Sequence, residues 1–101
     1  MDAVDAVEQH NLGVRLAREQ RYGEAIDCFY RAAQAGLVAS HKALYATLFA
    51  GSRISEAWRA ARAYLSSVPH DYAFANQFFG DIFIYDLYKE SNSNDLSSLI
   101  A

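Results

Sequence analysis

The chain repeats itself with a period of 32 residues, and this repeat limits the possible folds more than any local pattern does. A set of landmark residues near the N-terminus recurs, in weakened form, 32 positions downstream. The pairs are Leu12-Gly13 with Leu44-Tyr45, Tyr22 with Ile54, Ala25 with Ala57, Phe29 with Ala61 and Ala32 with Tyr64. A period of roughly 20–50 residues indicates stacked supersecondary units, none of which buries its apolar face alone. The repeat therefore favours a binding function over a catalytic one.

A third copy begins at Phe79-Gly80, 35 residues after Leu44-Tyr45, and has no recognisable second half. After Glu90 the chain becomes polar, with too little apolar surface to offset the entropy of ordering it. We therefore expect one domain over 1–90 that is followed by a flexible polar tail. The expected parts are repeat 1 at about 6–37, repeat 2 at about 38–72, a half repeat at about 73–90 and the tail at 91–101.

Apolar residues follow the helical period throughout, and typical helix-ending residues separate the segments. The expected helices run from about 3 to 19, 22 to 36, 38 to 50, 52 or 55 to 67, and 71 to 88 or beyond. Gly36 suits a left-handed C-terminal cap, and Gly51 ends the third helix. We expect Ser52 or Ser55 to cap the fourth helix, and Asp71 to cap the fifth. The sequence thus predicts an all-α fold of about five helices in antiparallel helix-turn-helix repeats.

Small and large residues alternate where paired helices are expected to meet. Gly13 and Ala25 allow close approach, and Phe29 fills the space between the helices. In the second copy Tyr45 stands in place of Gly13, and Ala61 stands in place of Phe29. We interpret this as an exchange of bulk between two facing helices.

These residues resemble the tetratricopeptide repeat, a helix-turn-helix unit of about 34 residues with an early Leu-Gly pair, an aromatic at the turn, then Ala, Phe and Ala. The first copy matches through Asn11-Leu12-Gly13, Tyr22-Gly23-Glu24-Ala25-Ile26 and Phe29-Tyr30-Arg31-Ala32; the second matches through Leu44, Leu48, Ile54-Ser55-Glu56-Ala57, Tyr64 and Pro69. The resemblance covers about residues 3–89. It implies a right-handed superhelix of the tetratricopeptide kind.

By this resemblance, the binding surface is the concave face that the first helix of each repeat forms. The expected partner-binding residues are His10, Val14, Arg18, Lys42, Phe49, Phe74, Gln77, Asp81 and Tyr85. The floor is largely apolar, which suits an apolar peptide or an amphipathic helix. The positions that hold a chaperone-tail carboxylate in other family members lack the required Lys, Arg and Asn, so no such clamp is expected. Alternatively, Phe74, Phe78 and Phe83 pack mainly against the fourth helix or a neighbouring chain.

The half repeat leaves the last helix without the second helix that would cover it. Its outer face carries Phe79, Phe83, Leu87 and Tyr88, and exposed apolar patches of this size usually mark an interface. Three alternatives stay open: the segment 96–101 folds back over this face, the chain pairs with itself to form a homo-oligomer, or the chain continues into a larger protein.

Charge and composition exclude several other functions. A net charge of -3 and a pI near 5.5 argue against a nucleic acid partner, which requires clustered basic residues. The longest mostly apolar run is too short for a membrane span, and no signal peptide is visible, so we expect a cytoplasmic protein. His10, His41 and His70 lack further ligands at metal-binding spacing, and Cys28 lacks a nearby His. We expect no enzymatic activity, no catalytic residues, no cofactor and no metal.

The sequence thus predicts a protein-protein interaction module that acts as an adaptor, an assembly factor or a chaperone-like holder of an apolar segment. The alternative is a structural unit that self-assembles through its aromatic C-terminal helix. A third reading is the regulatory part of an enzyme whose catalytic domain lies elsewhere.

Overall fold

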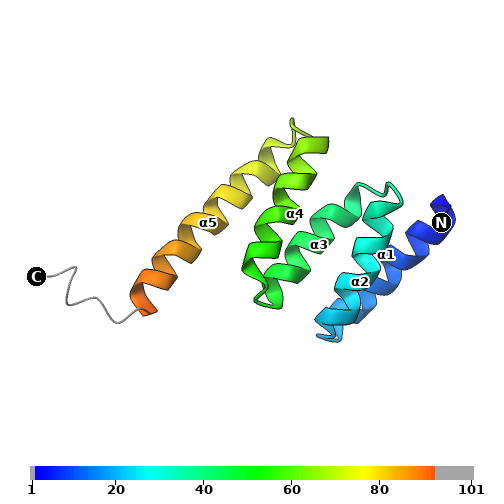
Figure 1. Ribbon diagram of the computed structural model, residues 1–101, viewed down its shortest axis with the longest axis horizontal. Helices are drawn as coiled ribbons and strands as arrows, with labels where there is room; N and C mark the ends of the chain where they lie inside the picture. Colours follow the sequence, from blue (N-terminus) through cyan, green and yellow to red (C-terminus); the bar gives the residue numbers. More distant parts are fainter. Residues whose placement is uncertain (1, 93–101) are drawn as a thin grey trace, which may run out of the picture. The chain divides into compact units, whose positions relative to one another are not determined.

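The computed structural model describes residues 2–92, and helices are the only regular secondary structure in this range. The helices are α1 (Ala3–Arg18), α2 (Tyr22–Gln34), α3 (Ala39–Ala50), α4 (Ile54–Ser67) and α5 (Tyr72–Asn92) (Figure 1). The predicted all-α class is confirmed. Helices α1 to α4 form one compact unit, and α5 belongs to a second unit.

Most helix ends lie where the sequence places them, and each has a local cause. Gly36 adopts φ 99° after α2, a left-handed conformation that favours glycine. Val68 leaves the helical region (φ -131°, ψ 71°) before Pro69, and α4 ends there. The Oδ1 atom of Asp71 accepts a 3.1 Å hydrogen bond from the backbone N–H of Phe74, as expected of the residue that caps α5.

The predicted serine cap of α4 is wrong. Arg53 is the N-cap residue, and no side-chain hydrogen bond caps this helix. Ser52 instead occupies a left-handed conformation with φ 63°, and its backbone N–H donates to Phe49 O at 3.0 Å. Backbone hydrogen bonds therefore close this turn. Ser52 belongs to the C-terminal end of α3 and does not cap the start of α4.

The turn between the two helices has the same geometry in both repeats, so the 32-residue repeat of the sequence is also a repeat of the structure. Gln20 lies at φ 61° in the first turn, as Ser52 does in the second. Arg21 N–H donates to Leu16 O at 2.9 Å, and Arg53 N–H donates to Leu48 O at the same distance. The two N-cap residues also share their backbone angles, with φ -89° and ψ 67° at Arg21 and φ -91° and ψ 69° at Arg53.

Within the first unit, α1 packs on α2, α2 on α3, and α3 on α4. A Cβ atom at Gly13 would lie 2.8 Å from Cε1 of Phe29, so the glycine is needed for the close approach of α1 to the Phe29 ring. In the second repeat Tyr45 is buried, and Ala61 has no exposed surface. The burial of both residues agrees with the predicted exchange of bulk between facing helices.

The second unit contains α5, which runs two residues past the predicted domain end at residue 90. The rest of the predicted polar tail, 93–101, lies outside the described residues, and so does the segment 96–101 considered as a cap. Across residues 2–92, no helix is both long and apolar enough to cross a membrane.

Candidate binding cleft

A cleft of about 550 Å³ lies between the second helices of the two repeats, α2 and α4. Both helices pack against α3, but they have no extensive contact with each other. The apolar lining comes from all three helices and consists of Ile26, Tyr30, Ala33, Leu44, Leu48, Ala60 and Ala63. The polar lining consists of Asp27, Gln34, His41, Arg53, Glu56 and Arg59.

Small side chains keep this cleft open. Ala33 on α2 and both Ala60 and Ala63 on α4 contribute only a methyl group each where a large side chain would fill the space. Leu44 and Leu48, one helical turn apart on α3, are buried and form the apolar floor. The sequence therefore provides a mainly apolar depression with polar groups around it.

One ion pair is fixed at the N-terminal end of α4. The Arg53 guanidinium donates to both carboxylate oxygens of Glu56, from Nε at 2.9 Å and from Nη2 at 2.6 Å. This hydrogen bonding lowers the pKa of Glu56 and raises that of Arg53. Ionised Glu56 stabilises the folded state at pH values above its ordinary pKa. This stabilisation is lost as the pH falls through the lowered pKa that Glu56 has in the folded state. Because both side chains are about half exposed, this contribution is small.

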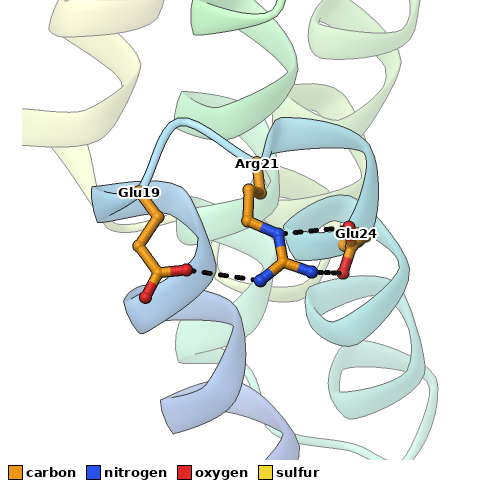
Figure 2. Close-up of polar contacts among 3 residues, drawn as sticks. All are labelled: Glu19, Arg21 and Glu24. Carbon is orange, nitrogen blue, oxygen red and sulfur yellow. Dashed lines mark hydrogen bonds and ion pairs between the residues drawn. The ribbon is translucent and has the colours of Figure 1, made fainter.

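The first repeat contains the equivalent pair outside the cleft (Figure 2). Arg21 Nη2 lies 2.5 Å from Glu24 Oε2, and Arg21 Nη1 lies 3.4 Å from Glu19 Oε2. The Arg-x-x-Glu pattern thus starts both second helices, 32 residues apart. This pattern was not among the features predicted from the sequence, although its recurrence at the repeat period was a readable signal.

Arg59 is a charged group of the cleft wall that is available to a ligand. It is exposed, and no residue of the range 2–92 hydrogen bonds or ion-pairs with it. Its charge acts on Glu56, whose pKa it helps to lower, but Glu56 is already engaged by Arg53. Asp27, across the cleft on α2, is also exposed, and its charge helps to raise the pKa of Arg53.

The residues predicted for the first-helix face of this unit do not line the cleft. His10 is half-buried, and its Nδ1 lies 2.8 Å from the Oγ of Ser40, a residue with no exposed surface. The His10 ring also meets the Phe29 ring edge-on at 5.2 Å. These contacts tie α1 to both α3 and α2. Val14 is half-buried and Arg18 is exposed.

On α3, Lys42 and Phe49 both contact aromatic residues. Lys42 Nζ lies 5.5 Å from the centre of the Tyr64 ring. Phe49 is half-buried, and its ring centre lies 6.1 Å from that of Tyr45 and 5.6 Å from that of Trp58. Tyr45 and Trp58 stack at 6.2 Å. The sequence analysis did not single out Trp58, which joins α4 to this aromatic cluster.

The remaining predicted residues lie on α5. Among the partner-binding residues, Phe74 is buried, Asp81 and Tyr85 are half-buried, and Gln77 is exposed. Phe78 is buried as well. All four residues of the outer face that were predicted to mediate self-association are exposed: Phe79 at 64%, Phe83 at 65%, Leu87 at 49% and Tyr88 at 65%.

Over residues 2–92, no three His, Cys, Asp or Glu side chains come together as metal ligands would. Cys28 is buried, and burial raises the pKa of its thiol, which opposes formation of the reactive thiolate.

Comparison of the chain with protein-family models, curated proteins and solved structures gives no match. The tetratricopeptide resemblance therefore stays a prediction from the sequence.

Proposed function

We propose that this chain is a protein-protein interaction module, an adaptor, assembly factor or chaperone-like holder, that binds an apolar peptide or helix. The observation that supports this function is the open apolar cleft between α2 and α4. Its volume of about 550 Å³ lies in the range of known ligand sites. The cleft is built from both repeats, so it needs the repeat architecture in order to exist.

A peptide segment suits the cleft because the cleft combines an apolar floor with charged groups around it. Leu44 and Leu48 provide an apolar floor, and charged groups such as Asp27 and Arg59 lie around it. An amphipathic helix places its apolar residues on one side and its polar residues at the edges, which matches this arrangement. The face formed by the first helices, with Phe49 and Tyr85 as anchors, remains a prediction for the same kind of partner.

Filling the cleft should block binding without disturbing the fold. Ala63 is exposed and lines the cleft, so Ala63→Trp places a large ring where a partner side chain would insert. We expect helical peptides selected from a display library on the wild-type chain to bind the variant at least about tenfold more weakly. Fluorescence anisotropy measures the affinities.

Ala46→Trp is the matched control, because Ala46 is an exposed alanine on the predicted first-helix face and outside the cleft. It should leave peptide affinity unchanged. If Ala46→Trp abolishes binding and Ala63→Trp does not, the cleft is not the binding site. If selection on the wild-type chain enriches no peptide and no second copy binds in a way that Ala63→Trp affects, the proposed binding function is wrong.

The exposure of the outer residues of α5 favours a second function, self-assembly. Phe79, Phe83, Leu87 and Tyr88 are all solvent-exposed, and helices with apolar residues on every side are normally buried on every side. We expect the molar mass, measured by light scattering, to rise between micromolar and millimolar concentration. A constant monomer mass over this range would contradict self-assembly.

A further inference from the structure

We propose that the cleft between α2 and α4 receives α5 from a second copy of this chain, with Asp86 of the incoming helix facing Arg59. This inference rests on the proposed function, because it requires that the cleft bind a protein segment. It goes further by naming the segment and the pair of charges that selects it.

The donor surface is a stripe along α5. Phe79, Phe83 and Leu87 follow at intervals of four residues, so they lie on one side of the helix, and all three are exposed. Asp86 lies three residues after Phe83 and therefore on the same side. Asp86 is exposed, and no other residue in the described range hydrogen bonds or ion-pairs with it. The stripe thus presents three apolar side chains and one available carboxylate.

The cleft presents the complementary features. Its floor is apolar at Leu44 and Leu48, and Tyr30 on α2 is an exposed aromatic residue of the wall. Arg59 on the opposite wall is the cation that lacks an ion-pair partner among residues 2–92, since Glu56 is engaged by Arg53. Arginine pairs with carboxylates in a planar geometry that a single incoming Asp can satisfy.

Charge is divided between the two parts of the sequence in a way that favours this partner. Residues 1–68 contain eight Lys and Arg and seven Asp and Glu, whereas residues 69–101 contain one Lys and five Asp and Glu. The C-terminal part is therefore acidic, with a net charge of -4, and the N-terminal part is slightly basic, at +1. The charged residues that line the cleft, Asp27, Arg53, Glu56 and Arg59, sum to zero. Two copies of the acidic C-terminal part repel each other, so contact between α5 and the cleft is favoured over contact between two α5 helices.

Each copy has one donor helix and one cleft. Two copies can exchange helices reciprocally in a closed dimer, or each copy can dock on the next in an open chain. The closed dimer covers both α5 stripes and fills both clefts, whereas an open chain leaves one stripe and one cleft unoccupied at its ends.

Exchange of the two charges in the full-length chain tests the proposal. Arg59→Glu and Asp86→Arg each place like charges at the contact, so each should weaken self-association about tenfold. The double variant restores an opposite pair and should associate within about threefold of the wild type, as should an equimolar mixture of the two single variants. Sedimentation equilibrium measures the association constants, and far-UV circular dichroism checks that each variant is folded.

Arg62→Glu is the matched control, because Arg62 is an exposed arginine on α4 that does not line the cleft. It should leave association unchanged. The proposal is overturned if the wild-type chain is monomeric at millimolar concentration, if the double variant fails to recover, or if Arg62→Glu weakens association as strongly as Arg59→Glu.

The cleft-filling variant separates failure of this inference from failure of the proposed function. If library peptides bind the wild-type chain and lose affinity in Ala63→Trp while the charge exchange shows no recovery, the cleft binds a different protein and only the present inference falls. If neither peptides nor a second copy bind in a way that Ala63→Trp affects, the proposed function falls with it.

Discussion

Replacing Gly13 with Tyr should lower the free energy of unfolding by about 3 kcal/mol. A Cβ atom added at Gly13 would lie within 3.0 Å of three ring carbons of Phe29, and Phe29 is only 2% exposed. The ring has little room to move, so α1 and α2 must separate. A domain of this size is stable by about 5–15 kcal/mol, so the loss is a large fraction of the total. Urea unfolding followed by far-UV circular dichroism measures it.

Removing Phe29 should rescue this variant. Phe29→Ala alone leaves a cavity and should cost about 3–5 kcal/mol. The double variant Gly13→Tyr with Phe29→Ala copies the second repeat, where Tyr45 and Ala61 occupy the equivalent positions. We expect it to be about 2 kcal/mol more stable than the sum of the two single effects predicts. Strictly additive effects would show that the two side chains do not compete for one space.

Gly23→Tyr serves as the control for the Gly13 substitution. A Cβ atom at Gly23 meets no other atom within 4 Å, so the same residue change there should alter stability by less than about 0.5 kcal/mol.

Replacing Tyr45 with Ala should destabilise the second repeat by about 3–5 kcal/mol. Tyr45 is 2% exposed, stacks on Trp58 and lies beside Phe49, so its removal leaves two neighbouring rings without contacts on one side. Ala61 is too small to fill the cavity. Thermal unfolding monitored by circular dichroism gives the change, and Tyr30→Ala, at an exposed tyrosine of α2, should have a far smaller effect.

Adding Ala61→Phe to Tyr45→Ala should recover part of this loss. The added ring comes from α4 instead of α3, which is how Phe29 of α2 fills the first repeat beside Gly13. Ala61→Phe in the wild-type chain should itself destabilise, because Ala61 has no exposed surface and a ring added there overpacks the core. A double variant no more stable than Tyr45→Ala would contradict the proposed exchange of bulk.

Local sequence signals were sufficient for most helix ends. Gly36, Pro69 and Asp71 each act through the backbone within a few residues of their own position, so their effects are readable without knowledge of the fold. The cap of α4 was predicted wrongly, because Ser52 has the chemistry of an N-cap but lies in the left-handed position of the preceding turn. The choice between these roles depends on the length of the turn, which composition does not specify.

Sequence reasoning placed the candidate site on the first-helix face, and the structure shows a cleft on the side of the second helices. Leu44 and Leu48 were expected as packing residues, and both are buried, but their role as the floor of a cleft was not anticipated. Nothing near Arg59 in the sequence distinguishes it from Arg62, and only the packing of α4 on α3 brings one of them to the cleft.

The sequence by itself determined the helical class, the 32-residue repeat and most helix ends. These features depend on interactions between near neighbours and on the equivalence of positions one period apart. Only the tertiary structure decided where an apolar cavity opens. The cleft arises because α2 and α4 both pack on α3 without filling the space between them. The small side chains of Ala33 on α2 and of Ala60 and Ala63 on α4 leave that space open. No local pattern encodes the distance between two helices that are not neighbours in the sequence.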